Sequence, residues 1–210
     1  MACCLVCINY AFRMGIADTQ AYKARYLLEQ WEREQRLPTK GEADEAVAAV
    51  TLALRWEPDN TEYMDLKAHV LTYKGLLNWD AGDFVGVTTE SVQLYLLATK
   101  YRPKWPYAWA RLALVKSYRG EYDDVFVQAL ENAVLYGPWE PGVQVTVAEA
   151  GLYAWVHLNS ASKSHVVSNI QRGLSYKYKE MSGIIKRFNR KNSICASLLN
   201  TSKTARLCGW

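Results

Sequence analysis

The residue types that most often carry out chemistry are scattered along this sequence of 210 residues. The five cysteines lie in two groups near the two ends of the chain: Cys3, Cys4, Cys7, Cys195 and Cys208. The three histidines stand apart from both groups: His69, His157 and His165. Zinc sites gather such ligands at short spacings, and a nucleophilic cysteine needs a partnered base. The sequence therefore predicts no metal site and no cofactor.

No motif predicts an enzyme active site. The chain has no Walker motif, GxSxG, HExxH or nucleotide-sugar fingerprint. Asp123 and Asp124 are adjacent carboxylates, but they fall at a turn and at the start of a predicted helix, where the helix dipole favours acids. One catalytic alternative stays open, in which Glu149 and His69 meet in a groove and act on a polysaccharide or its lipid-linked precursor.

A recurring segment ending organises the chain. A small residue is followed by an aromatic residue three positions later and by a proline two positions after that, in residues 53–58, 98–103 and 133–138. The alanine allows two helices to approach closely, and the proline stops the helix. We expect the aromatic residue to cover the seam to the next unit. Three copies predict a helical repeat protein.

The period of this repeat spans two helices. Ten residues after each proline stands an alanine, at Ala68, Ala113 and Ala148, so the first helix of the following unit also carries a small residue at a fixed place. The prolines are 45 and 35 residues apart, which predicts an insertion over residues 78–87. Strand-like alternation of β-branched residues is missing, so we expect an all-α fold. Helix turns are predicted near 37–41, 78–87, 119–122 and 158–163.

The pattern resembles the tetratricopeptide repeat family. The matching positions are Trp109, Leu112, Ala113, Gly120, Tyr122 and Asp123 in the best unit, and Ala46, Val50, Ala53 and Pro58 in the first. The resemblance implies a right-handed solenoid of about four helical hairpins over residues 18–192. A hydrophobic N-terminal segment, residues 1–17, would precede it, and a C-terminal tail, residues 193–210, would follow.

Both ends of the predicted solenoid have a distinct character. Residues 2–12 are apolar but number about eleven, whereas a membrane-spanning helix needs roughly 20. We expect one long helix from about Leu5 to Gln35, and both a membrane stub and a truncated anchor stay open. At the other end, an apolar stripe predicts an amphipathic helix that caps the last repeat or lies on anionic lipid: Leu174, Tyr178, Met181, Ile185 and Phe188.

Charge is divided unevenly along the chain. Residues 1–162 hold 15 Lys and Arg against 20 Asp and Glu, whereas residues 163–210 hold 10 against one, Glu180. A basic tail can meet nucleic acid, an anionic membrane or an acidic partner, or it can simply be a solvated face. No motif that reads bases accompanies it, so we do not expect nucleic acid as a partner.

Candidate contact residues follow from the tetratricopeptide resemblance, because first helices line the concave face in that family. The register places Tyr73, Tyr118 and Tyr153 in one column. Glu62, Asp65 and His69 stand beside it at one end. Such a column suits an extended peptide or a glycan strand, although these tyrosines also suit helix-to-helix packing. The tryptophans are expected at seams between units: Trp56, Trp105, Trp109, Trp139 and Trp155.

A narrower resemblance covers most of the chain. Residues 53–71 (ALRWEPDNTEYMDLKAHVL), 102–121 (RPKWPYAWARLALVKSYRGE), 137–152 (GPWEPGVQVTVAEAGL), 194–199 (ICASLL) and 205–208 (ARLC) are similar to the VpsP-type polysaccharide biosynthesis proteins. The resemblance implies an accessory protein of bacterial exopolysaccharide synthesis or export, associated with the inner membrane, with its repeats in the periplasm. Its partners would be proteins of that machinery, a glycan or the membrane surface. A cytoplasmic adaptor is the alternative.

The implied compartment bears on the C-terminal cysteines. An oxidising periplasm would join Cys195 and Cys208 in a disulfide across a Ser/Thr-rich segment that we expect to be poor in helix. In the cytosol both thiols would stay free. Oxidation of the N-terminal cysteines instead, or a simple apolar contact at Cys208, stays open.

Overall fold

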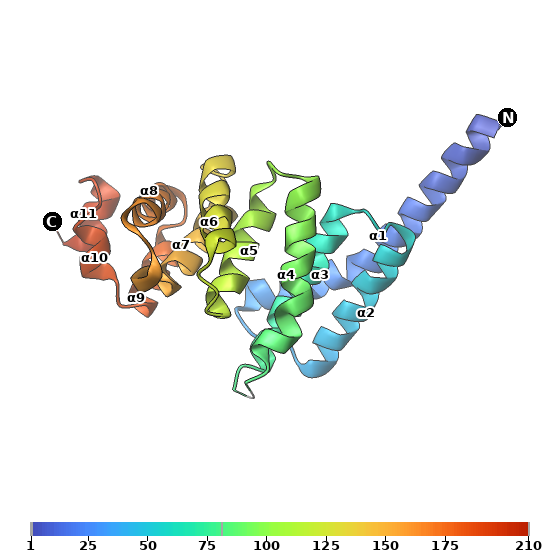
Figure 1. The fold of residues 1–210 in the computed structure, drawn as a ribbon, viewed down its shortest axis with the longest axis horizontal. Helices are drawn as coiled ribbons and strands as arrows, with labels where there is room; N and C mark the ends of the chain where they lie inside the picture. The colour runs from blue at the N-terminus through green and yellow to red at the C-terminus, as the bar shows by residue number, and fades with distance from the viewer. Residues whose placement is uncertain (1, 81, 210) are drawn as a thin grey trace. The chain divides into compact units, whose positions relative to one another are not determined.

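The computed structural model describes residues 2–80 and 82–209, with the side chains of residues 2–6 left out of the description. Every regular element in this described part is a helix, and no strand occurs in it (Figure 1). This confirms the predicted all-α fold. The chain divides into two compact units, Met1–Arg102 and Pro103–Trp210.

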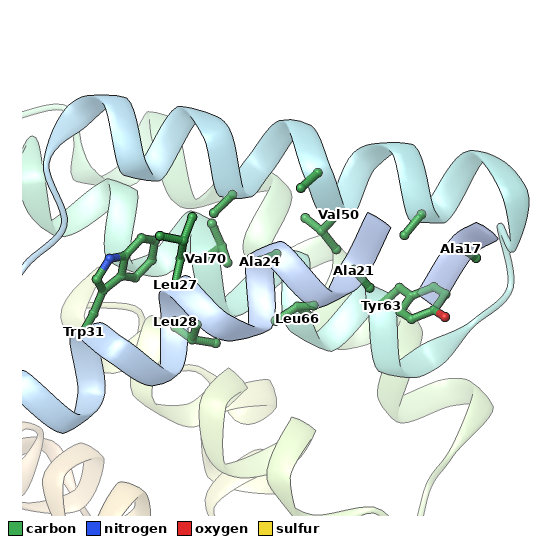
Figure 2. Close-up of a cluster of buried hydrophobic side chains, with 13 residues drawn as sticks. Ala17, Ala21, Ala24, Leu27, Leu28, Trp31, Val50, Tyr63, Leu66 and Val70 are labelled. Carbon is green, nitrogen blue, oxygen red and sulfur yellow. The ribbon is translucent and has the colours of Figure 1, made fainter. Parts of the chain in front are cut away.

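The first unit contains four long helices: α1 (Ala2–Glu34), α2 (Lys40–Trp56), α3 (Thr61–Leu77) and α4 (Phe84–Tyr101). Helices α1 and α2 pack as neighbours, as do α3 and α4, and α2 also packs on α3. Along α1 the alanines Ala17, Ala21 and Ala24 are fully buried, and Figure 2 shows them in the core together with Trp31. Spaced three and four residues apart, they form one small-residue face that lets the neighbouring helices approach.

Local capping explains where these helices begin. The Thr39 hydroxyl accepts from the Glu42 backbone N–H, and the Glu42 carboxylate accepts from the Thr39 N–H, which makes a capping box at the start of α2. At the start of α3, the Asn60 side chain accepts from the N–H groups of Glu62 and Tyr63. These caps satisfy donors that the first helical turn leaves unpaired.

The insertion predicted over residues 78–87 is too long. Helix α4 already begins at Phe84, so the connection occupies residues 78–83, of which Ala81 lies outside the described residues. Phe84 is buried, and its ring lies against Trp79 at a centroid distance of 4.9 Å and against Gly75. Burial of this ring brings the start of α4 onto the end of α3.

The second unit begins with four helices in two neighbouring pairs: α5 (Pro106–Tyr118), α6 (Asp124–Tyr136), α7 (Pro141–Tyr153) and α8 (Ser160–Tyr176). The first helices of the two pairs, α5 and α7, also pack on each other. Asp123 caps α6 by accepting from the Phe126 N–H at 2.9 Å, which confirms the structural role expected for this acid. The predicted turn at 119–122 is also confirmed.

The turn predicted near 158–163 exists but lies earlier, over residues 154–159. The chain leaves α7 at Tyr153, forms a short 3-10 helix, η1 (Trp155–His157), and enters α8 at Ser160. The Asn159 side chain accepts from the Ser162 N–H at 2.8 Å, so the helix starts earlier than the apolar pattern indicated. Such a cap is local and does not need an apolar residue in the first turn.

The C-terminal region also differs from the prediction. The apolar stripe from Leu174 to Phe188 does not lie on one helix, because α8 ends at Tyr176 and α9 (Tyr178–Arg187) follows a break at Lys177. Helix α9 turns back onto α7 and α8 and buries Met181. The Met181 Cε occupies the space where a Cβ at Gly173 would lie, so the absence of a side chain there permits this contact. The tail is not poor in helix either, since it contains α10 (Lys191–Cys195) and α11 (Ser202–Cys208).

The small and the aromatic residues of the repeat pattern differ in their burial. The alanines of the pattern are buried, as a close helix contact requires: Ala53, Ala68, Ala98, Ala113, Ala133 and Ala148. The aromatic residues Trp56, Tyr101 and Tyr136 are partly exposed, and the expectation that they cover seams stays a prediction. Each is the last residue of its helix, where the chain turns away.

Candidate functional site

In the first unit, Tyr73 and His69 share one cluster with α1. The His69 ring lies 5.4 Å from the Tyr73 ring, and the Tyr73 ring lies 5.7 Å from the Trp31 ring. His69 Nε2 is 3.5 Å from the Glu32 carboxylate. Both Tyr73 and His69 are half-buried, so part of each ring reaches the surface.

The two acids predicted beside Tyr73 have different environments. Glu62 is exposed and forms an ion pair with Arg25 at 2.8 Å, and Arg25 also binds Asp18 at 2.7 Å. Asp65 is buried on α3. Glu62 therefore belongs to a charged surface network, whereas Asp65 belongs to the interior of the first unit.

In the second unit, three helices bring a tyrosine, a carboxylate and an arginine together. The Tyr118 hydroxyl of α5 donates to Glu149 Oε1 of α7 at 2.7 Å. Arg187, at the end of α9, donates to the same oxygen at 2.7 Å through Nη1. Burial, followed by the neighbouring Glu149 carboxylate, raises the pKa of Tyr118 far above its usual range. The hydroxyl therefore stays protonated and remains a donor to Glu149.

Aromatic rings surround this hydrogen-bonded group. The Tyr153 ring makes edge contacts with Tyr118 at 5.2 Å and with Phe188 at 5.9 Å. Nearby, the Tyr122 ring stacks on His157 at 4.1 Å. These rings are half-buried, except for His157, which is exposed. We call the set formed by Tyr118, Tyr122, Glu149, Tyr153, His157, Arg187 and Phe188 the aromatic face.

The predicted tyrosine column is thus brought together in part. Tyr118 and Tyr153 touch within the second unit, and Tyr73 belongs to the first, so a column through all three stays a prediction. The pairing of Glu149 with His69 also joins residues of different units and stays a hypothesis. Glu149 is engaged by Tyr118 and Arg187. Nothing in the sequence indicated that Arg187 would contact Glu149, because Glu149 lies 38 residues earlier in the chain.

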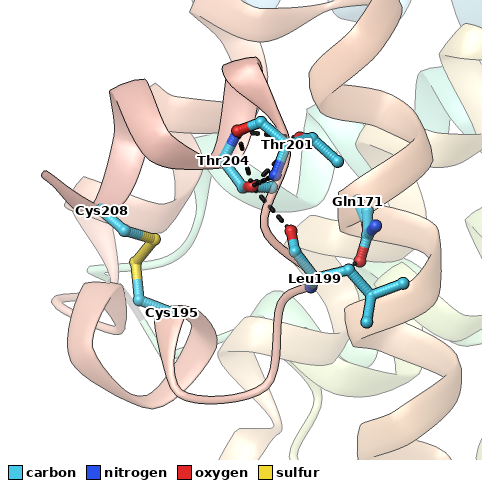
Figure 3. Close-up of a disulfide and its surroundings, with 6 residues drawn as sticks. All are labelled: Gln171, Cys195, Leu199, Thr201, Thr204 and Cys208. Atoms are coloured by element: carbon cyan, nitrogen blue, oxygen red, sulfur yellow. Dashed lines mark hydrogen bonds between the residues drawn. A yellow bond between two sulfur atoms is a disulfide. The ribbon is translucent and has the colours of Figure 1, made fainter. Parts of the chain in front are cut away.

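The cysteines separate into a bonded pair and an N-terminal group. Cys195 and Cys208 form a disulfide in the structure, with Cα atoms 5.7 Å apart (Figure 3). Cys7 is exposed and free, whereas the side chains of Cys3 and Cys4 lie outside the described residues. Cys4 and Cys7 have C-x-x-C spacing. Among the described residues, no group of His, Cys, Asp or Glu side chains is arranged to hold a metal ion.

The tryptophans expected at seams fall into two classes. Trp109 and Trp155 are buried, in agreement with packing between helices, whereas Trp56, Trp105 and Trp139 are exposed. A place at a seam stays a prediction for these three residues. Trp139 is the most exposed of them, at 66%. It lies in the connection between α6 and α7.

Helix α1 carries exposed apolar residues near its start, including Ile8, Tyr10 and Phe12. In the described part of the chain, no helix is both long enough and apolar enough to cross a membrane. No protein-family model and no curated protein sequence matches this chain.

Proposed function

We propose that this chain is a non-catalytic helical scaffold whose aromatic face binds an extended segment of a partner protein. Its hairpins would form a right-handed tetratricopeptide-like array, with α9 as the capping helix. The observation that carries the proposal is the convergence of α5, α7 and α9 on Tyr118, Tyr153 and the Glu149–Arg187 pair. First helices that pack side by side and expose rings are the usual platform for peptide binding in helical repeats.

The chemistry of the aromatic face suits a peptide with apolar and acidic side chains. Half-buried rings offer flat apolar area at little cost in conformational entropy, because each is already held by its neighbours. The Arg187 side chain is 58% exposed while it contacts Glu149, so it retains donors for a second carboxylate. A peptide that inserts an apolar side chain beside Tyr153 could place an acid next to Arg187.

The biological setting is proposed from the resemblance to VpsP-type proteins. In that setting, the scaffold would stand in the periplasm and would hold a protein of an exopolysaccharide synthesis or export complex. The N-terminal part of α1, with its exposed apolar residues, would contact the inner membrane or a membrane protein. A cytoplasmic adaptor is the second possible setting, and the state of the C-terminal cysteines in the cell distinguishes the two.

Photo-crosslinking in intact cells tests the proposal. A crosslinkable amino acid is placed at Tyr153 on the aromatic face and, as a matched control, at Leu135, which is exposed on α6. We expect a discrete crosslinked protein from position 153 only, and we expect Arg187→Glu to abolish it. Equal crosslinking from both positions would contradict the proposal. Turnover of the polymer or its precursor by purified protein, lost in Glu149→Gln, would favour the enzyme instead.

A further inference from the structure

A second site lies in the second unit and shares no residue with the aromatic face. It is an open pocket of about 450 Å³ between α8, the connection from α6 to α7, and the start of α11. Its lining includes Trp139, Arg172, Tyr176 and Lys203. The volume falls within the roughly 300–1,000 Å³ of small-molecule sites. Three segments that are distant in the sequence therefore build one concave site.

Arg172 brings a positive charge to this pocket, and no carboxylate among the described residues balances it. Its Nε donates to the Pro138 carbonyl at 3.2 Å, which positions the guanidinium group. Its Nη2 is buried, and no hydrogen-bond partner for it is present in the part of the chain that the structure describes. Burial lowers the pKa of Arg172, and no acid counteracts the shift. An anionic ligand in the pocket would supply the counter-charge that this guanidinium group lacks among the described residues.

The remaining lining adds a second cation and no acid. Lys203 projects from the start of α11, and none of the described residues that line the pocket is Asp or Glu. The site therefore favours an anionic ligand. Arginine binds carboxylates through two parallel N–H donors, which adds geometric selectivity to the attraction of charge.

Two exposed aromatic side chains complete the pocket. Trp139 is 66% exposed and Tyr176 is 62% exposed, although both are large enough to be buried in a core. Hydroxyl groups of Ser175 and Ser202 lie in the same lining. A flat ring suits the C–H face of a sugar, and hydroxyls suit its polar edge. An acidic peptide would use the cations but would not need this combination of exposed rings and hydroxyls.

We infer that this pocket binds an acidic saccharide, a sugar ring that carries a carboxylate. The carboxylate pairs with Arg172 and Lys203, and the ring lies against Trp139. The inference goes beyond the proposed scaffold function, since it assigns a ligand to a separate site. It holds whether or not the aromatic face binds a protein.

The disulfide supports one wall of this pocket. Cys195 and Cys208 join α10 to α11, and Figure 3 shows the intervening segment held on α8, where the Leu199 N–H donates to Gln171 Oε1 at 3.1 Å. Lys203 lies in the segment that the disulfide closes, between Cys195 and Cys208. Reduction would release α11 from α10 and would leave the cation less well placed. Saccharide affinity is therefore coupled to oxidation of the two cysteines.

Calorimetric titration of the purified, oxidised full-length chain tests the inference. The probe is an oligogalacturonate tetramer, and the matched probe is its methyl ester, which keeps the rings but has no charge. We expect saturable binding of the acid and at least about tenfold weaker binding of the ester, since the charged pairs are lost. We expect a similar loss in Arg172→Gln, Lys203→Gln and Trp139→Ala, with native helical content by circular dichroism.

Control measurements decide between the possible causes. Trp105→Ala removes an exposed tryptophan outside the pocket and is expected to leave the affinity unchanged. Three results would each overturn the inference that the ligand is an acidic saccharide. They are equal affinity for the methyl ester, equal affinity for an oligoglutamate peptide, and full affinity in the folded Lys203→Gln variant. Unchanged affinity in Cys208→Ser would overturn the coupling of saccharide affinity to the disulfide. Crosslinking at Tyr153 reports separately on the scaffold function.

Discussion

The indole Nε1 of Trp109 donates to the carbonyl oxygen of Pro103 at 2.8 Å. One hairpin later, Gln144 Nε2 donates to the carbonyl of Pro138 at 2.7 Å, with the same separation of six residues. Each proline stands just after the end of a second helix, and each donor lies on the next first helix. The same closure therefore recurs where the chain passes from one hairpin to the next, although the donor side chain changes from an indole to an amide.

Replacing the Trp109 donor should loosen this closure. Trp109→Phe keeps an aromatic ring but leaves the Pro103 carbonyl without its side-chain donor. We expect a loss of about 1–3 kcal/mol in the free energy of unfolding. Urea denaturation followed by circular dichroism measures it. Trp105→Phe, a change at an exposed ring, serves as the control and should stay within roughly 0.5 kcal/mol of the unsubstituted protein. Equal stabilities of the two variants would exclude the hydrogen bond as a contributor.

The close contact of α5 with its neighbours predicts a strong size effect at Ala113. This alanine is fully buried, so Ala113→Trp forces added volume into a filled interior. We expect a destabilisation of at least about 1–3 kcal/mol, or loss of the fold. Thermal unfolding measures the effect, and Ala161→Trp, at an exposed position of α8, is the matched control. An unchanged melting temperature for Ala113→Trp would remove this residue from the helix contact.

A buried lysine predicts an acid-dependent loss of stability. Lys116 Nζ lies 2.8 Å from Glu121 Oε2 and 2.9 Å from Asp123 Oδ2, and the Lys116 side chain is almost entirely covered. Burial alone would raise the pKa values of both acids. The hydrogen bonds and charge of Lys116, together with Arg119 at Glu121 and the Phe126 N–H at Asp123, outweigh it and lower both pKa values. In the unfolded chain, these carboxyl groups have pKa values of about 4. Because their pKa values are lower in the folded protein, they stabilise the fold, and this stabilisation is fully present above about pH 4. This stabilisation disappears as the pH falls through the folded values.

The substitution Lys116→Met tests this assignment. The variant should be less stable at neutral pH, because it removes the cation that both carboxylates share. It should also show a smaller fall in stability between about pH 5 and pH 2 than the unsubstituted protein, since less pKa depression remains. Urea midpoints measured across that range give the comparison. Parallel pH profiles for the two proteins would contradict the role of Lys116.

The disulfide predicts a redox-dependent stability and a compartment. Cys195 and Cys208 are separated by 13 positions, and closing such a loop contributes about 3 kcal/mol in the loop-entropy model. We expect reductant to lower the melting temperature of the native chain and to leave that of Cys195→Ser unaffected. Thiol alkylation and peptide mapping of protein from gently lysed cells test the compartment. Free Cys195 and Cys208 would defeat the periplasmic assignment and favour a cytoplasmic adaptor.

Local signals in the sequence were sufficient to predict the helical fold and several of the positions at which helices begin and end. Prolines at 58, 103 and 138 mark ends of helices because proline cannot continue one, and Asp123 identifies the start of α6 because its carboxylate caps free N–H groups. The alanines at fixed places in the repeat predicted close contacts, since only a small side chain leaves room for a neighbouring helix. Each of these inferences depends on a few residues close together in the chain.

Only the tertiary structure decided which side chains meet and which remain exposed. Arg187 reaches Glu149 because α9 turns back at Lys177, whereas the continuous apolar stripe had predicted one longer helix. Trp139 and Arg172 line one pocket because α8 lies beside the connection that follows α6. No sequence pattern encodes either outcome, because exposure and charge pairing depend on what distant segments cover. The sequence by itself determined the helices and their ends through local sterics and capping, and the packing of those helices determined the sites.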